Sequence, residues 1–355
     1  MTKQEIATPA LLVDLDRMQS NLERMAAFFH SLPAKLRPHF KNHRAPELAH
    51  QQLKAGAIGL TCSTLREAEC LVEHGVHSVL LANEIVDAVK IPRLVDLSRR
   101  SDLIVCVDNE KVAADLALAS AQAQTPVSVL VDVDVGLHRC GVPPGDPTVR
   151  LVRTVMEKGL RFRGLMGYEG HLSRLMPEQS KTDAIIAALG PLVGTKAYLE
   201  DEGIAVEIVS VSATGTYMSS ACIPGVTEVQ AGSYLLMDTN YRECCTDFDL
   251  TLTILATVIS KTGRKYLVVD AGMKILSCER GIPLVKYPEG LTLRRLNAEH
   301  GTLDLGENAR DIQVGDRIEI WVRYSDATIN LHDRMYGVRN GQVEKVFQLC
   351  GRNCQ

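Results

Sequence analysis

The feature that most constrains the fold is an alternation of short apolar runs with amphipathic stretches between about residues 10 and 240. The apolar run at 11–15 precedes a helical pattern from Met18 to Phe29, and the run at 57–61 precedes one that begins near Thr64. Further apolar runs lie at residues 78–82, 102–107, 127–133, 162–167 and 206–211. Strands separated by helices pair in parallel. The number of units approaches the eight of a (β/α)8 TIM-type barrel, whose chemistry gathers at the carboxyl ends of its strands.

The pattern of apolar and polar residues changes after about residue 245. Segments that alternate or are rich in β-forming residues lie at 250–260, 265–269, 317–322, 336–339 and 343–348. Asn340-Gly341 lies between the last two, and this pair is a strong hairpin signal. We therefore predict an α/β protein with a barrel domain over residues 10–245. A second, mostly antiparallel β domain is predicted over residues 246–355, together with residues 1–9.

Charge and composition favour small-molecule chemistry. The formal net charge is -4, the calculated pI is near 6.2 and 5% of the residues are aromatic, so neither the basic surface nor the stacking rings of a nucleic-acid binder are expected. Residues 1–5 lack the apolar run of a signal peptide, and no stretch approaches the ~20 apolar residues that span a bilayer. The sequence predicts a cytoplasmic protein that binds neither nucleic acid nor membrane.

The ten cysteines do not indicate a disulfide framework. Most lie singly in apolar context, where a cysteine acts as a small hydrophobe and reduced thiols are expected; examples are Cys62, Cys106, Cys222 and Cys278. Neither Cys244-Cys245 nor the pair Cys350 and Cys354 has the paired spacing of a zinc ribbon, so no metal is assigned to them.

Lys41 is the most informative single residue. It lies in the segment RPHFKNHR, residues 37–44, just after an apolar stretch and among cationic or potentially cationic neighbours. Desolvation and nearby positive charge make an ammonium group easier to deprotonate, and a neutral amine can form a covalent bond with a carbonyl compound. A solvated basic loop is the alternative for this segment taken alone.

Three further segments fall where barrel strands are expected to end. VDVGLHRCG places Arg139 after a glycine, where a guanidinium can hold a phenolate or carboxylate. SVSATGTY, residues 210–217, is a hydroxyl-rich turn, and with Gly232 and Ser233 it offers backbone N–H groups and hydroxyls to a phosphate. GYEGH delivers His171, which can accept a hydroxyl proton near neutral pH. Each segment alone is also compatible with an ordinary surface turn.

The ordered set of segments resembles one enzyme family. RPHFKNHR, TCSTLREAE, LANE, GLHRCGV, GYEGH, EVQAGSY and TINLHD follow one another over nearly the whole chain. They resemble the D-threonine aldolase and D-serine dehydratase-like family, which comprises pyridoxal-phosphate enzymes of the alanine racemase fold (fold type III).

The resemblance implies a role for each matching position. Lys41 matches the lysine that binds the coenzyme covalently, and His171 matches the base that acts on the substrate β-hydroxyl. Arg139 matches an arginine near the phenolic oxygen, and Gln230 falls where related racemases use an arginine against the pyridine nitrogen. The remaining residues that the resemblance assigns to cofactor binding are Tyr168, Ser212, Thr214, Gly215, Thr216, Gly232 and Ser233.

The sequence departs from the family at the expected metal site. Family members have a histidine, one intervening residue and then aspartate or cysteine, whereas this chain has Tyr324-Ser325-Asp326. Asp326 alone would bind Mg²⁺ or Mn²⁺ weakly, and a tyrosine with an ordinary pKa near ~10 is a poor ligand for such ions. Tyr324 could be a bystander, could replace the metal as a hydrogen-bond donor to the β-hydroxyl, or could mark a different reaction. Arg323 could pair with an acidic substrate or be solvated.

The resulting prediction is a pyridoxal-phosphate lyase that cleaves a D-β-hydroxy-α-amino acid, of the D-threonine or D-3-hydroxyaspartate type, to glycine and an aldehyde. The alternatives are a D-serine or D-3-hydroxyaspartate dehydratase, an amino-acid racemase and a non-catalytic carrier of the coenzyme; a metal-binding or structural protein is favoured least. The resemblance also implies a homodimer with its active site at the subunit interface.

Overall fold

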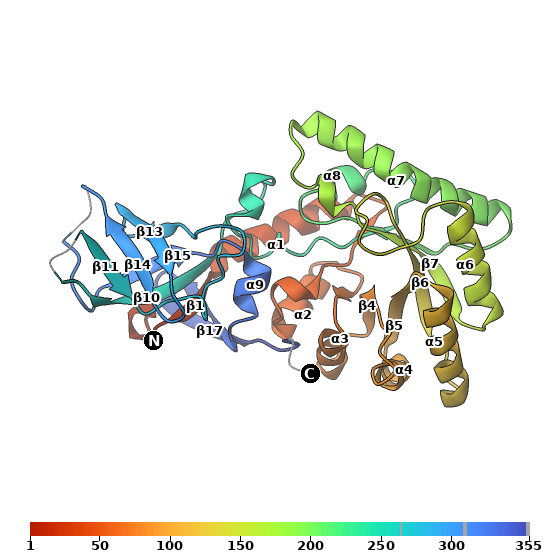
Figure 1. Ribbon diagram of the computed structural model, residues 1–355, viewed down its shortest axis with the longest axis horizontal. Coiled ribbons are helices and arrows are strands. Elements are labelled where there is room, and N and C mark those ends of the chain that lie inside the picture. Colours follow the sequence, from red (N-terminus) through yellow and green to blue (C-terminus); the bar gives the residue numbers. More distant parts are fainter. Residues whose placement is uncertain (263–264, 308–310, 353–355) are drawn as a thin grey trace. The chain divides into compact units, whose positions relative to one another are not determined.

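The computed structural model describes residues 1–262, 265–307 and 311–352 (Figure 1). The chain forms two compact units. The first, which we call the β unit, comprises Met1–Arg24, Asn42–Glu47 and Ser233–Cys350. The second, the barrel unit, comprises Met25–Lys41, Leu48–Gly232 and the residues from Gly351 onward. Each unit is therefore built from separate stretches of the sequence.

An eight-stranded parallel sheet forms the barrel unit. Its order is β2 (Lys35–Leu36), β9 (Glu228–Val229), β8 (Ile208–Val211), β7 (Arg161–Gly167), β6 (Ser128–Val133), β5 (Asp102–Val107), β4 (Ser78–Glu84) and β3 (Leu60–Cys62). The Thr61 amide donates to the Pro38 carbonyl, and His39 and Thr61 form a parallel bridge. These bonds join the two edge strands, so the eight strands close into the predicted barrel.

Helices follow most of the strands, as expected for parallel pairing. Their bounds are α1 (Leu15–His30), α2 (Pro46–Lys54), α3 (Leu65–Glu73), α4 (Ile91–Arg100), α5 (Glu110–Ala123), α6 (Asp146–Glu157), α7 (Glu178–Asp201) and α8 (Tyr217–Ser220). Thr64 is the N-cap of α3 and accepts the Glu67 amide at 3.2 Å. Both helices named from the sequence, near Met18 and near Thr64, are confirmed. No helix among the described residues is long and apolar enough to cross a bilayer.

The β unit is a nine-stranded, mostly antiparallel sheet. Seven strands run in the order β13 (Leu291–Leu296), β14 (Gly301–Leu305), β11 (Tyr266–Val269), β10 (Leu252–Ser260), β1 (Ala10–Asp14), β16 (Arg334–Arg339) and β17 (Gln342–Gln348). β15 (Arg317–Trp321) pairs with β10 and with β12 (Val285–Tyr287), and a short helix, α9 (Ser325–Ile329), follows β15. Asn340 and Gly341, both at positive φ, join β16 to β17 in the predicted hairpin.

One strand belongs to the other unit than the sequence suggested. Residues 11–15 were expected to open the barrel, but β1 pairs with β10 and β16 of the β unit, so this expectation is wrong. The reason is that an apolar run before a helix has the same local pattern in either setting. The barrel instead uses β2 and β9, which have two residues each.

Apolar side chains fill both units. In the barrel a buried cluster contains Leu80, Ile104, Cys106, Leu130, Met166 and Ile208. In the β unit Ile6, Ala10, Leu12 and Leu255 form a second cluster.

The four cysteines named from the sequence are free thiols, but their settings differ. Cys62 and Cys106 are buried, as expected, whereas Cys222 is exposed and Cys278 is half-buried. Reduction is not general, because Cys70 and Cys350 are disulfide-bonded. Cys354 lies outside the described residues.

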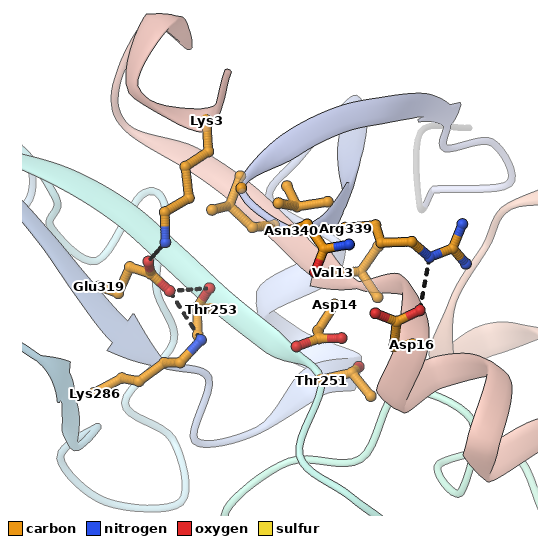
Figure 2. Close-up of a pocket in the computed structure, with 13 residues that line it drawn as sticks. Lys3, Val13, Asp14, Asp16, Thr251, Thr253, Lys286, Glu319, Arg339 and Asn340 are labelled. Carbon is orange, nitrogen blue, oxygen red and sulfur yellow. Dashed lines mark hydrogen bonds and ion pairs between the residues drawn. The ribbon is translucent and has the colours of Figure 1, made fainter. Parts of the chain in front are cut away.

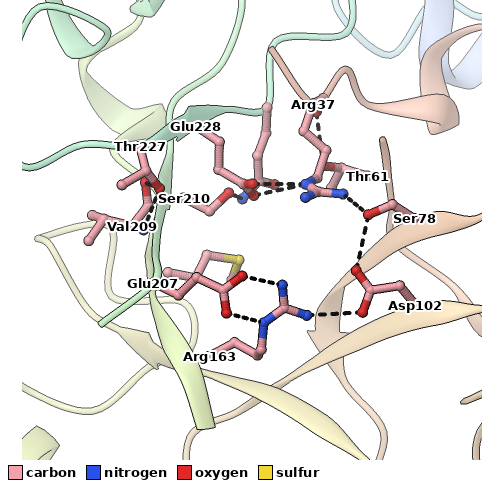
Figure 3. A network of polar contacts seen from close by, with 12 residues as sticks. Arg37, Thr61, Ser78, Asp102, Arg163, Glu207, Val209, Ser210, Thr227 and Glu228 are labelled. Carbon is pink, nitrogen blue, oxygen red and sulfur yellow. Dashed lines mark hydrogen bonds and ion pairs between the residues drawn. The ribbon is translucent and has the colours of Figure 1, made fainter. Parts of the chain in front are cut away.

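A polar network occupies the end of the barrel where the strands begin (Figure 3). The Arg37 guanidinium donates to both carboxylate oxygens of Glu228 at 3.0 Å and to Ser78 at 2.9 Å. Arg163 links Asp102 and Glu207. A side chain at Gly59 would clash with this arrangement, since its Cβ would lie 2.2 Å from Arg37 Nη1. The network therefore fills the barrel end opposite to the carboxyl ends of the strands.

A cavity of about 200 Å³ lies in the β unit, between β1, β10, β15 and the 340–341 hairpin (Figure 2). Its central charge is Glu319, which is paired with Lys3 and, at 3.0 Å, with Lys286. Burial raises the pKa of Glu319, but the two lysines outweigh this effect and hold the pKa below its ordinary value of 4.5. The charges that surround this cavity are thus compensated within the unit.

Replacing Glu319 with glutamine is expected to destabilise the β unit by about 2 kcal/mol at pH 7, because two lysines lose a buried acceptor. A carboxylate with a lowered pKa in the folded state stabilises above its unfolded pKa and loses this contribution as the pH falls through the folded value. The difference between wild type and E319Q should therefore shrink below pH 4.5. Urea unfolding, followed by fluorescence of the single tryptophan, Trp321, measures the free energy of unfolding of both proteins at each pH. E344Q, at an exposed ion pair, is the control, and a pH-independent difference would contradict the assignment.

Candidate active site

Lys41 lies at the carboxyl end of β2, within the short helix η2 (Phe40–Asn42), and is half-buried. The cationic neighbours counted in the sequence are engaged elsewhere. Arg37 is bound to Glu228 at the opposite end of the barrel, and Arg44 donates to Asn330 within the β unit. Arg37 therefore does not add positive charge beside Lys41, whereas Lys41 lies at the carboxyl end of a barrel strand, as the sequence predicts.

The loops after β7, β8 and β9 meet around two glycines. A Cβ at Gly232 would lie 2.7 Å from the His39 carbonyl oxygen, which belongs to the segment that carries Lys41. A Cβ at Gly215 would lie 2.7 Å from the Ser173 Cβ. Both positions thus require glycine, and they bring the turn at 212–216 and the loop at 230–232 to the same rim as Lys41.

The amide N–H groups of Gly215 and Gly232 point to an anionic ligand. Both residues are buried, and among the described residues neither N–H has an acceptor. Buried backbone donors without an acceptor are rare in folded proteins. Two such donors on neighbouring loops, next to a rim lysine, fit the phosphate group of a coenzyme that is bound to Lys41.

Hydrogen bonds to Glu169 hold the turn at 212–216 in place. Glu169 lies in the GYEGH segment, and the sequence assigned it no role. Its carboxylate is fully buried and accepts the Ser212 amide at 3.1 Å, the Thr216 hydroxyl at 2.7 Å and the Ser220 hydroxyl at 2.6 Å. The Thr216 amide donates to the Ala213 carbonyl, and the Ser212 hydroxyl bonds to the same carbonyl. Thr216 and Ser212 therefore shape the turn through these donors, and their contact with a phosphate stays a prediction.

The loops after β6 and β7 carry the other predicted residues. A Cβ at Gly136 would lie 3.3 Å from Nε2 of His171, so the imidazole lies directly beside the Gly136 backbone. His171 is exposed, which leaves it accessible to a substrate. The Arg139 guanidinium lies 5.2 Å from the centre of the Tyr168 ring, within cation–π range. The structure thus brings Arg139, Tyr168 and His171 together on two adjacent strand ends.

Gln230, after β9, lies beside Ser210 of β8. Its Nε2 donates to the Ser210 hydroxyl at 2.9 Å, which fixes the orientation of the side-chain amide. A neutral amide at this position is what the sequence predicted.

An acidic group that the sequence reasoning missed lies at the ends of β4, β5 and β6. Glu84, Asp108 and Cys140 each place a potential ligand atom within 4.8 Å of the others. Asp132 is buried beside them. Burial and the charge of Glu84 raise the pKa of Asp132 to about 8, although Arg139 opposes this shift. The raised pKa favours the protonated form of Asp132, whose side chain hydrogen-bonds to Glu84.

The predicted metal residue Asp326 lies in the β unit. Its Oδ1 accepts the Asn42 side-chain amide at 2.8 Å, and the same amide donates to Ser325 at 2.7 Å and more weakly to Ser233 at 3.4 Å. Asp238 accepts the Ser325 hydroxyl at 2.6 Å, and burial raises its pKa to about 6. Asp326 is thus one member of a hydrogen-bonded network.

The donors around Asp326 in the β unit do not complete a metal site. Burial and the charge of Asp326 raise the pKa of Tyr324, so the phenol stays protonated, and Arg280 lies 5.3 Å from the ring centre. Among the described residues, no group of three potential ligands includes Asp326. Arg323 is neither solvated nor open to a substrate carboxylate, because it pairs with Glu243 and donates to the Arg280 and Thr239 carbonyls.

Comparison with known proteins agrees with this architecture. The family model for the alanine racemase N-terminal domain matches residues 13–240, and the D-serine dehydratase domain model matches residues 251–338. A D-threonine aldolase from Arthrobacter sp. is 33% identical over 98% of this chain and 93% of its own length. A 3-hydroxy-D-aspartate aldolase from Paracoccus denitrificans is 31% identical over 99% and 94%. The crystal structure of D-threonine aldolase from Filomicrobium marinum superposes with a TM-score of 0.95 at 35% identity, covering 100% and 97% of the two chains.

The fold and the residues at the carboxyl ends of the barrel strands, together with these relatives, define a lyase-class enzyme with the alanine racemase fold. Pyridoxal phosphate is the cofactor that this family implies. The chain belongs to the D-threonine aldolase and D-serine dehydratase-like family of that fold.

Proposed function

We propose that this enzyme uses pyridoxal phosphate to cleave a D-β-hydroxy-α-amino acid, of the D-threonine or D-3-hydroxyaspartate type, into glycine and an aldehyde. The observation that carries the cofactor assignment is the pair of buried N–H groups of Gly215 and Gly232 on the rim that carries Lys41. The aldolase names of relatives that are 31–35% identical over nearly full length support the reaction class.

Each residue on the rim has a task in this reaction. When bound, the cofactor supplies an electron sink for the substrate α-carbon. Lys41 would hold the cofactor covalently through its amine. His171, exposed beside Gly136, removes the proton from the β-hydroxyl as the Cα–Cβ bond breaks. Arg139 would donate to the phenolic oxygen of the cofactor, and Gln230 would lie near its pyridine nitrogen as a neutral amide.

The phosphate of the cofactor would be held by backbone donors on two loops. Thr214, Gly215, Gly232 and Ser233 remain the proposed phosphate contacts, whereas Ser212 and Thr216 support them by shaping the turn. Tyr168 supports Arg139 through its ring. No step of this proposal requires a metal on Asp326.

The test is to incubate the purified enzyme, loaded with pyridoxal phosphate, with D-threonine, D-phenylserine or D-3-hydroxyaspartate and to assay glycine and aldehyde. Glycine and aldehyde in equal amounts from at least one substrate are expected, and the L-enantiomers serve as controls. Absence of glycine from all of them would overturn the proposal.

Dehydration is the second candidate, because a D-threo-3-hydroxyaspartate dehydratase from Delftia sp. is 32% identical over 89% of this chain and 88% of its own length. Release of a keto acid and ammonia in the same assay would identify it. A racemase would instead incorporate solvent deuterium at Cα and leave the carbon skeleton intact. The homodimer with a shared active site and the cytoplasmic location remain predictions; sedimentation and cell fractionation test them.

A further inference from the structure

The residues of the turn at 212–216 carry no positive charge to balance the negative charge of a bound phosphate. A phosphate monoester carries a charge of about −1.5 to −2 near pH 7. The turn offers it neutral donors, and Glu169, the acidic residue behind the turn, is fully buried. A dianion against the Gly215 amide would therefore lie near a buried acidic group, where water screens charge poorly.

A buried lysine lies on the same turn. Lys181, in the first turn of α7, has a side chain that is 3% exposed, and its Nζ lies 3.3 Å from the Gly215 carbonyl oxygen. Lysine side chains are almost never fully buried unless they are paired. Lys181 also pairs with Glu178 at 2.7 Å, but Glu178 is 55% exposed. Solvent screens the exposed carboxylate more strongly than the buried ammonium, so the positive charge dominates on the side of the turn.

We infer that Lys181 supplies the buried counter-charge for the phosphate group, from its place at the Gly215 carbonyl on the same turn. This inference rests on the proposed function and names a residue that selects the phosphorylated form of the cofactor. The ammonium contacts the carbonyl of Gly215, in the peptide unit next to the one that contains the unpartnered Gly215 N–H. It therefore opposes the field of Glu169 at the position where the phosphate is expected.

The experiment compares two cofactor forms on the full-length protein freed of cofactor. Pyridoxal phosphate and pyridoxal both offer an aldehyde to Lys41, but only the first carries a phosphate. Replacing Lys181 with methionine should weaken pyridoxal phosphate binding on the order of tenfold and change pyridoxal binding by less than about twofold. Inorganic phosphate, tested as a competitor of pyridoxal phosphate, should lose affinity in the same proportion.

Three further variants distinguish an effect of the Lys181 charge from a general loss of structure. K181R keeps the charge and should restore selectivity for the phosphorylated form. E178Q removes the competing carboxylate and should strengthen pyridoxal phosphate binding, which a purely structural role for this pair does not predict. K196M removes an ion pair with Glu200 on the same helix and should bind both forms like the wild type.

Equal loss of pyridoxal phosphate and pyridoxal binding in K181M, or no loss of either, would overturn the inference while leaving the proposed function in place. Failure of the wild-type protein to bind pyridoxal phosphate at all would instead overturn the proposed function itself.

Discussion

Replacing Lys41 with alanine is expected to lower the rate of glycine formation by at least about a thousandfold, because no other amine of the rim occupies the end of β2. The visible absorbance band of the lysine-bound cofactor should disappear at the same time. Borohydride should then fix no cofactor to the protein, whereas in the wild type mass spectrometry should find the reduced label on the peptide that contains Lys41. Circular dichroism checks that the barrel remains folded.

Lys35 provides the matched control for this experiment. It lies in β2, six residues before Lys41, and its Nζ donates to the Leu32 carbonyl. K35A should keep both the absorbance band and the activity. Reduction that labels another lysine in wild-type protein, such as the buried Lys181, would show that Lys41 is not the attachment site.

Replacing Glu228 with glutamine is expected to destabilise the barrel unit by about 3–5 kcal/mol, since it leaves a buried charge without its partner. The side chains of Arg37 and Glu228 are 5% and 2% exposed, so water cannot replace the lost carboxylate. Ser78 remains as a neutral partner of Arg37 and does not compensate for the charge. Urea unfolding followed by far-ultraviolet circular dichroism measures the loss.

Two further variants test the cause of that loss. E207Q affects an ion pair whose carboxylate is 54% exposed and should change stability by less than about 1 kcal/mol. Replacing both partners, as R37M/E228L, should recover part of the stability lost in E228Q, because the uncompensated charge is removed. A double variant less stable than E228Q would show that packing, and not charge, dominates at this end of the barrel.

Much of the barrel could be predicted because its longer strands are continuous apolar runs. The runs at 78–82, 102–107, 127–133, 162–167 and 206–211 match β4, β5, β6, β7 and β8 closely. β2 and β9 could not be found in this way, since two residues carry no periodicity. In the β unit, β12, β13 and β14 were missed, and β13 is largely polar on its exposed side.

Candidate site residues could be predicted where a local motif contains them. They could not be predicted where a residue's role depends on contacts with distant parts of the chain. Lys41, Arg139, His171, Gly215 and Gly232 could be named as candidates because their neighbours in the chain form motifs. The roles of Thr216 and Glu169 depend on a contact across 47 positions, which no local pattern contains. Lys181 gave no signal either, because an isolated lysine near a helix start is usually solvated. Asp132 could have been suspected, since an aspartate within an apolar strand is costly unless it is protonated or paired.

The placement of β1 has a consequence for the order of events during synthesis. This strand is translated before the barrel sequence, yet its hydrogen-bonding neighbours β10 and β16 are made only after that sequence has been translated. Contacts so distant along the chain slow folding, and an apolar strand that waits for its partners is exposed to aggregation meanwhile. β1 is therefore a segment of the growing polypeptide on which a chaperone is expected to act while the barrel sequence is being made.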